Sequence, residues 1–188
     1  MSPLIPPRLV PPVRGVNEYY LAAEQVPAAP VRAVLAFGSN LGERAATLAA
    51  AEAGLGDTPG IRVIAMSTAI DSVAVKLSGP DPDAPGYLNA VGLIETTLSP
   101  RALLQATAAI ERRHGRERSE RWGDRTLDID IIAYAEERVR TPDLVIPHPR
   151  AAERDFVLAP WLEIDPAAVL PGAGPVAEVL ARLREETP

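Results

Sequence analysis

Two aspartates separated by one residue, Asp128 and Asp130, are candidate metal ligands in this chain. They lie in the run LDIDIIAY, whose apolar residues predict a largely buried strand from Leu127 to Tyr134. Residues two apart on a strand point to the same face, so the two carboxylates are expected about 6.6 Å apart. Such a pair is repulsive unless a cation lies between its members, and hard oxygen ligands favour Mg²⁺. The pair predicts a magnesium site, with a solvated strand face as the alternative for a D-x-D motif taken alone.

An arginine-rich segment directly precedes this strand. Six arginines fall within fourteen residues, although the chain carries a net charge of −6. The first two, Arg112 and Arg113, could simply complement the dipole at a helix C-terminus. Four more follow them: Arg116, Arg118, Arg121 and Arg125. These four supply the counter-charge that a polyphosphate needs, so the arginines and the aspartates together predict a Mg²⁺–nucleotide site.

The composition narrows the class of protein. A chain of 188 residues with 47% hydrophobic and 23% charged residues fits one globular domain with a core. The net charge of −6 and a pI near 5.0 argue against general affinity for nucleic acid or anionic membranes. The chain has no cysteine, which excludes disulfides and thiolate metal sites. There is no leader-like N-terminus and no apolar run of about 20 residues, so we expect a cytoplasmic protein without a membrane partner.

The elements that position these residues follow an N-terminal arm. Residues 1–30 contain seven prolines, which predict an extended, largely disordered arm with at most a helical turn at 17–25. The domain proper is expected at 31–188. Its predicted elements are strands at 31–37, 61–75, 87–98 and 127–134, and helices at 42–55, 99–114, 151–162 and 176–183.

Local signals support these boundaries. Asn40 and Glu43 have the spacing of a capping box, and Ser99-Pro100 is typical of a helix start. The strands at 61–75 and 87–98 are joined by an irregular loop and predict a wide hairpin. The resulting order, β-α-β-β-α-β, predicts an α+β ferredoxin-like fold, with helices packed on one face of an antiparallel sheet.

Several separate motifs resemble those of one known family. They are FGSNLG at 37–42, YLN at 87–89, GRER at 115–118, RWGDRTLDID at 121–130, PH at 147–148 and RDF at 154–156. GSNLG alone would be only a glycine turn with an Asn cap, because the lysine and hydroxyl of a P-loop are missing. Together the motifs are similar to those of the 6-hydroxymethyl-7,8-dihydropterin pyrophosphokinases, from about residue 31 to 175. The resemblance implies a Mg²⁺-dependent diphosphotransferase of folate biosynthesis, which transfers pyrophosphate from ATP to the hydroxymethyl group of the pterin and releases AMP.

The resemblance also implies roles for individual residues. Asp128 and Asp130 would hold two Mg²⁺ ions, and Arg116 and Arg125 would join them as catalytic residues. The implied ATP-binding residues are Glu111, Arg116, Arg118, Arg121, Trp122, Arg125, Ile131, His148 and Arg154. The implied pterin-binding residues are Val73, Tyr87, Asn89, Trp122, Asp128 and Phe156. Without the resemblance, His148 could be structural, Tyr87 and Phe156 core anchors, and Glu111 a helical ion-pair partner.

Two features depart from the family pattern. Residues 71–86 are longer than, and different from, the family's T-P-P-x-G loop, and Asp124 replaces a proline. Two other functions fit part of the sequence: a ferredoxin-like nucleic-acid-binding module, and a D-x-D nucleotidyltransferase that would release pyrophosphate. The acidic pI and the lack of an aromatic base-stacking motif argue against the first. We expect ATP and the pterin as partners, no nucleic acid, and a monomer.

Overall fold

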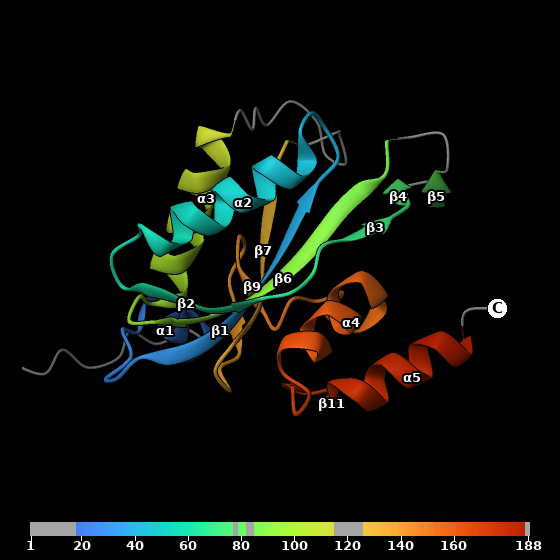
Figure 1. Ribbon diagram of the computed structural model, residues 1–188. Coiled ribbons are helices and arrows are strands. Elements are labelled where there is room, and N and C mark those ends of the chain that lie inside the picture. The colour runs from blue at the N-terminus through green and yellow to red at the C-terminus, as the bar shows by residue number, and fades with distance from the viewer. Residues whose placement is uncertain (1–17, 77–78, 82–84, 115–125, 187–188) are drawn as a thin grey trace, which may run out of the picture.

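The computed structural model describes residues 18–76, 79–81, 85–114 and 126–186. Its central unit consists of β1 (Val31–Ser39), α2 (Arg44–Gly56), β2 (Ile61–Met66), β6 (Tyr87–Thr96), α3 (Pro100–Arg113) and β7 (Asp128–Tyr134) (Figure 1). These strands form a sheet in the order β2-β6-β1-β7, in which all neighbours are antiparallel. The predicted β-α-β-β-α-β order and the α+β ferredoxin-like fold are confirmed.

Both faces of the sheet are covered by helices, which corrects the prediction of helices on one face. Alternate residues of β1 point to opposite sides, so Leu35 and Phe37 pack with α2 and α3, whereas Val34 faces the other way. There it meets Val91 and Ile132 from the neighbouring strands. α4 (Asp155–Ile164) and α5 (Val176–Glu186) cover this second apolar face (Figure 1). Strands that are apolar on both faces need a layer on each side.

The folded part of the chain begins earlier than predicted. Residues Glu18–Glu24 form a helix, α1, and Ala23 is fully buried in the core beside α2 and α3. Arg101 of α3 holds this helix, because its Nε donates to Glu24 Oε1 at 3.0 Å. The predicted helical turn is confirmed as Glu18–Glu24, and this helix packs on the core through Ala23. Residues 1–17 lie outside the described part of the chain.

The long strand predicted at 61–75 is interrupted. It splits into β2, β3 (Ile70–Ser72) and β4 (Ala74–Lys76), and β2 and β3 both pair with β6. At the break, Ser67 Oγ accepts from the backbone N of Val91 at 2.9 Å and replaces a main-chain partner. Glu163 of α4 accepts from both N and Oγ1 of Thr68, at 2.9 and 2.7 Å. Side-chain hydrogen bonds therefore compensate for the lost strand geometry.

The helix starts differ in how well the sequence signals predicted them. Ser99 caps α3 as expected, since its side chain accepts from the backbone N of Ala102. The capping box at α2 is wrong: Glu43 is the cap residue, without a side-chain hydrogen bond, and Asn40 is buried before the helix. The remaining elements are β5 (Gly79–Asp81), β8 (Val139–Arg140), β9 (Val145–Ile146), the 3-10 turn η1 (Ala151–Glu153), β10 (Val169–Leu170) and β11 (Gly174–Pro175). Among the described residues, no helix has the length and apolarity to cross a membrane.

Candidate active site

One row of residues crosses three strands at the end of the sheet. Gly38 of β1 is paired with Asn89 of β6 on one side and with Asp128 of β7 on the other. Two residues away on β1, Ala36 is paired in the same way with Val91 of β6 and Asp130 of β7. The register thus places an amide and two carboxylates at neighbouring positions on one end of the sheet.

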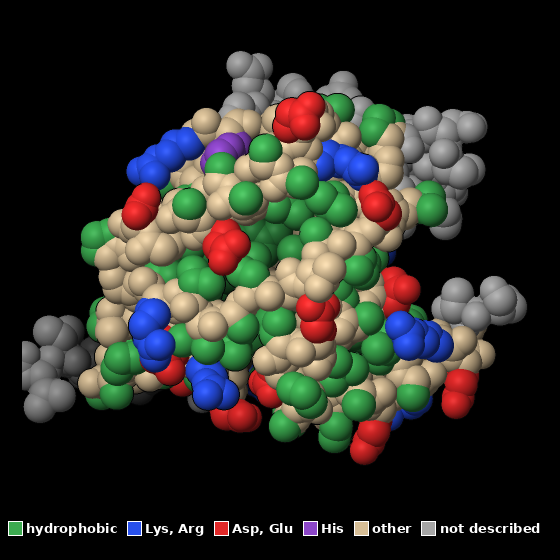
Figure 2. Space-filling model, in the orientation of Figure 1, with side chains coloured by type: hydrophobic (Ala, Val, Ile, Leu, Met, Phe, Trp, Pro, Cys, Tyr) green, Lys and Arg blue, Asp and Glu red, His purple; other side chains and the backbone are tan. Residues whose placement is uncertain are grey.

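The two aspartates point to the same face of the sheet, as the strand period predicted, and this is the face that α4 covers. Ile129 and Ile131, which alternate with them, are buried in the core formed with α2 and α3. Asp128 and Asp130 are both partly exposed. The face of the molecule drawn in Figure 2 shows acidic and basic side chains interspersed with hydrophobic surface.

Asp130 is surrounded by basic side chains from the segment that leads into α4. Arg154 Nη1 donates to Asp130 Oδ2 at 2.9 Å, and His148 Nε2 lies 3.6 Å from the same oxygen. His148 Nδ1 accepts from the backbone N of Arg150 at 3.1 Å, which leaves the imidazole hydrogen on Nε2, toward the carboxylate. Burial lowers the pKa of His148; Asp130 opposes this effect, and Arg154 and Arg150 lower the pKa further.

The carboxylates of Asp128 and Asp130 fit a metal ion that keeps much of its own hydration shell. Within the described residues, no group of three or more His, Cys, Asp or Glu side chains is arranged so that it could hold a metal ion by itself. Asp128 and Asp130 would therefore supply only part of a coordination sphere. Mg²⁺ is commonly bound in this way, by one or two carboxylates with water and substrate phosphates as the other ligands.

Beside the aspartates, Gly38 carries no side chain, and Tyr87 and Asn89 are its nearest neighbours there. A Cβ atom on this residue would lie 3.4 Å from Tyr87 Cδ1 and 3.5 Å from Asn89 Oδ1. The ring of Tyr87 and the amide of Asn89 therefore border the space that a side chain would otherwise occupy. Flat polar heterocycles are bound by such a combination of an aromatic face and an amide edge.

Phe156 lies at the start of α4, the helix that packs against β6. Its ring is partly buried, and the Arg154 guanidinium lies 5.8 Å from the ring centroid. This distance is within the range of a cation–π contact. Arg154 therefore connects Phe156 with Asp130, so that residues implied for the pterin and for ATP lie next to each other.

Glu111 makes a contact that neither sequence interpretation contained. Only 5% of this residue is exposed, and its Oε1 accepts from the backbone N of Ile129 at 2.8 Å. Ile129 stands between the two aspartates on β7, which is the edge strand of the sheet. Glu111 thus satisfies a main-chain donor on this edge and fixes α3 to the strand of the aspartates.

Ile131 is buried, whereas the side chain of Val73 is exposed. The side chain of Ile131 is 4% exposed and packs in the core under α2 and α3, so the predicted contact of Ile131 with ATP would be made by its backbone. Val73 is 52% exposed and follows the end of β3. The other candidate residues, Arg116, Arg118, Arg121, Trp122 and Arg125, lie outside the described residues, as does Asp124.

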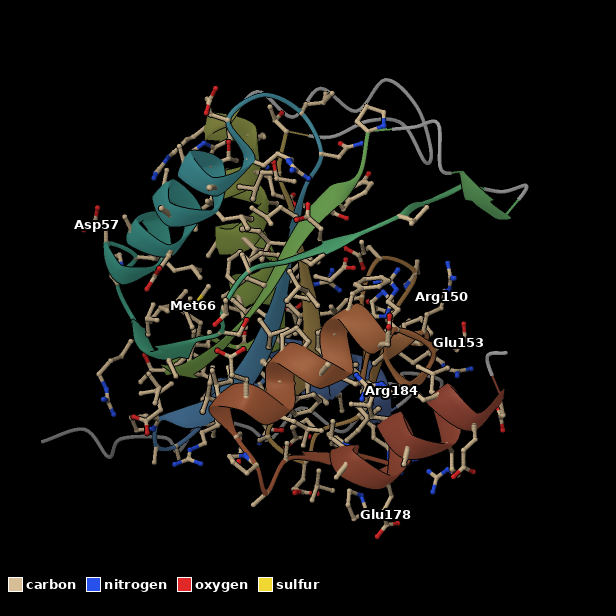
Figure 3. The ribbon with its side chains drawn as sticks, turned by 45° about the vertical axis from the view of Figure 1, so that its right-hand side comes forward. Asp57, Met66, Arg150, Glu153, Glu178 and Arg184 are labelled. Carbon is tan, nitrogen blue, oxygen red and sulfur yellow. The ribbon has the colours of Figure 1, made fainter. Side chains whose placement is uncertain are left out.

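Sequence reasoning missed three residues around these groups. Arg44 Nη1 donates to Asp71 Oδ1 at 2.9 Å and to the backbone O of Gly86 at 2.8 Å, which joins the two ends of the divergent segment 71–86. Ser72 Oγ accepts from Asn89 Nδ2. Arg150 lies beside His148 and pairs with Glu153 through its Nε at 3.3 Å, at the approach to α4 (Figure 3). No local pattern marks Arg44, because its partners are 27 and 42 residues away.

The fold and these side chains define a class, the ferredoxin-like α+β domains with a paired-carboxylate site at the end of the sheet. Within that class, the family model described as 7,8-dihydro-6-hydroxymethylpterin-pyrophosphokinase (HPPK) matches residues 34–166. The chain belongs to this family.

Curated relatives and solved structures agree with this assignment. A 2-amino-4-hydroxy-6-hydroxymethyldihydropteridine pyrophosphokinase from Methylorubrum extorquens is 45% identical over 154 residues, which cover 81% of this chain and 93% of the relative. The enzyme of the same name from Haemophilus influenzae is 37% identical over 155 residues, covering 82% and 94%. A Plasmodium falciparum HPPK-DHPS structure with pterin and p-hydroxybenzoate aligns with a TM-score of 0.63 at 13% identity. The match covers 87% of this chain but only 45% of that longer one, and it supports the fold alone.

Proposed function

We propose that the chain carries out its family's reaction at the end of the sheet marked by Asn89, Gly38 and Asp128. The reaction is the transfer of pyrophosphate from ATP to the hydroxymethyl group of 6-hydroxymethyl-7,8-dihydropterin, a step of folate biosynthesis. The observation that carries the proposal is the register: it sets an amide, an unfilled position and a carboxylate in one row. The family assignment favours this function over a nucleic-acid-binding module or a nucleotidyltransferase.

The pterin would lie over Gly38. Tyr87 and Phe156 offer aromatic surface from β6 and from α4, and Asn89 offers a hydrogen-bonding edge. Asp128, at the far end of the row, would stand near the hydroxymethyl group. In this arrangement the reacting oxygen is close to the paired carboxylates, and positioning of this kind lowers the barrier for transfer.

ATP would approach from the side of His148 and Arg154. Their basic groups now face Asp130, at 3.6 and 2.9 Å, and a polyphosphate would compete for the same donors. Arg116 and Arg125, with Arg118, Arg121 and Trp122, remain predicted ATP-binding residues. The hydroxymethyl oxygen attacks the β-phosphorus, the bond between this phosphorus and the α,β-bridging oxygen breaks, and AMP leaves.

ATP and Mg²⁺ are the co-substrate and the cation of this family, and we propose two ions held by Asp128 and Asp130. Bound Mg²⁺ neutralises charge that develops on the phosphate oxygens. Arg154 would fix the orientation of the Asp130 carboxylate through its hydrogen bond. We also propose that the chain acts as a cytoplasmic monomer without a nucleic-acid partner, which size-exclusion chromatography with light scattering tests in part.

The direct test is incubation with ATP, Mg²⁺ and the pterin, followed by nucleotide analysis. AMP that forms only when the pterin is present supports the proposed reaction. Release of inorganic pyrophosphate would favour a nucleotidyltransferase, and retention on RNA without turnover would favour a binding module. Asp128→Asn, assayed in parallel, is the control, because it removes one carboxylate charge while keeping the size of the side chain.

A further inference from the structure

Helix α1 lies outside the part of the chain that the family model matches, which begins at residue 34. It packs against both α3 and β8. Its Ala23 is fully buried and belongs to the same core cluster as Val139 of β8 and Ile146 of β9. The buried side of α1 is therefore joined through the core to the hairpin that β8 and β9 form.

One arginine of α3 connects α1 to the turn of this hairpin. Arg101 Nε donates to Glu24 Oε1 of α1 at 3.0 Å, and Arg101 Nη1 donates to Asp143 Oδ2. Arg101 Nη2 donates to Thr141 Oγ1 at 3.3 Å. Only 17% of the Arg101 side chain is exposed, although both carboxylates are largely exposed. A single guanidinium thus joins α1, α3 and the turn between β8 and β9.

Thr141 closes the turn that Arg101 contacts. Its backbone N donates to the O of Leu144 at 2.8 Å, and its Oγ1 accepts from the backbone N of Leu144 at 3.0 Å. The same hydroxyl lies 2.9 Å from Asp143 Oδ1, to which it can donate. Arg101 therefore contacts the two residues whose side chains hold the turn in shape.

The hairpin leads directly into the ATP side of the candidate site. β9 ends at Ile146, which is 2% exposed, and His148 follows two residues later. The backbone N of His148 donates to the O of Ile132 at 2.9 Å, so this stretch runs beside β7, the edge strand of the sheet. A contact that holds the hairpin in place therefore also limits where His148 lies relative to Asp130.

We propose that α1 and Arg101 together support the β8–β9 hairpin, residues 139–146, and thereby position His148. The helix does not touch the substrates in this arrangement and acts only through the hairpin. The expected effect on ATP rests on the proposed function, because His148 is taken as an ATP-binding residue. The expected effect on the hairpin itself does not depend on any activity.

The test compares the chain without residues 1–26 with the chain without residues 1–17, which keeps α1. Removal of α1 should make amide hydrogen exchange at 139–146 at least about tenfold faster and leave exchange in β6 within about twofold, because local opening depends on local contacts. The KM for ATP should rise about fivefold, with the KM for the pterin within about twofold of wild type. Removal of residues 1–17 should change none of these values.

Glu24→Gln tests the same connection with α1 in place, and it decides the question if the chain without α1 does not fold. We expect exchange at 139–146 to rise about twofold to threefold, as for a partly exposed ion pair. Leu21→Ala is the matched control, because Leu21 is on the same helix, is 59% exposed and is replaced by a good helix former. It should leave exchange at 139–146 and both KM values unchanged.

The possible results separate the proposal from its alternatives. Unchanged exchange at 139–146 in the chain without α1, or in Glu24→Gln if that chain does not fold, would overturn the support of the hairpin. An equal rise of exchange in β6 would indicate a general loss of stability and would overturn it as well. Faster exchange with an unchanged KM for ATP would overturn the positioning of His148. Wild type without pterin-dependent AMP would refute the proposed function and leave the exchange result standing.

Discussion

Substitution of Gly38 by alanine should separate activity from stability. Gly38 is not among the glycines with positive φ, so an alanine fits the backbone. The added Cβ would lie 3.4 Å or more from Tyr87 and Asn89, which is ordinary van der Waals contact. Because alanine also restricts the unfolded chain, we expect the free energy of unfolding to stay constant or to rise by about 0.4–1 kcal/mol. The corresponding rise in Tm is roughly 2–4 °C per kcal/mol for a chain of this size.

The same methyl group occupies the space assigned to the pterin. We expect the KM for the pterin to rise at least about tenfold, which corresponds to about 1.4 kcal/mol of binding free energy. The KM for ATP should change little, because the His148 and Arg154 side is untouched. AMP formation at varied pterin and at varied ATP measures the first effect, and thermal unfolding measures the second.

Gly92→Ala provides the opposite control on β6. A Cβ there would lie 2.6 Å from Met66 Sδ and 3.0 Å from Phe37 Cε2, so the core must shift (Figure 3 labels Met66). We expect about 1–3 kcal/mol of lost stability, with the KM for the pterin unchanged in the folded protein. A Gly38→Ala variant with a normal KM for the pterin would refute the position of the ligand. A large loss of stability in that variant would refute the reasoning from the spacing around Gly38.

Four further perturbations test other parts of the structure. Asp128→Asn or Asp130→Asn should lower turnover at least about a hundredfold at unchanged Tm. EDTA should lower the turnover of the wild type to a similar extent, and normal rates in these variants would count against Asp128 and Asp130 as metal ligands. Glu111→Leu should lower the free energy of unfolding, measured with denaturant, by about 1–3 kcal/mol, because the backbone N of Ile129 loses its acceptor. Glu111→Gln keeps an acceptor and should not, so equal losses in the two variants would contradict the role of this hydrogen bond. Arg44→Gln should raise the KM for the pterin a few-fold, as expected for a surface contact of about 1 kcal/mol, and an equal rise for ATP would argue against a local effect. Burial raises the pKa of Tyr134 to about 12, so between pH 10 and 12 the unfolded chain loses a proton that the folded chain keeps, and stability falls as the pH rises; an ultraviolet titration in which all tyrosines ionise near pH 10 would disprove it.

The parts of the fold that depend on near neighbours were predictable from the sequence. Ser99-Pro100 located the start of α3, because a cap needs only the next few residues. The break after Met66 was not predictable, since it depends on Ser67 binding the backbone of β6 and on Glu163 reaching Thr68 from α4. Composition alone predicted a β-branched strand there, and tertiary contacts decided otherwise.

The candidate site also contains features that were predictable from the sequence and features that depend on tertiary packing. The common direction of Asp128 and Asp130 follows from the strand period, and no other part of the chain is needed to predict it. The contact of Glu111 depends on how α3 packs against β7, and that of Ser72 on how β3 aligns with β6. The sequence motifs could mark which residues matter, but only the packing defines which of them hold others in place.

The second layer of helices has a consequence for biosynthesis. All strands of the central sheet have been made once Tyr134 leaves the ribosome, yet the helices that shield Val34, Val91 and Ile132 come later in the chain. Until these helices have been synthesised, the nascent chain exposes a hydrophobic face of the sheet, to which chaperones or other copies of the chain can bind. A stop codon just before Asp155 should therefore yield aggregates rather than a smaller working enzyme.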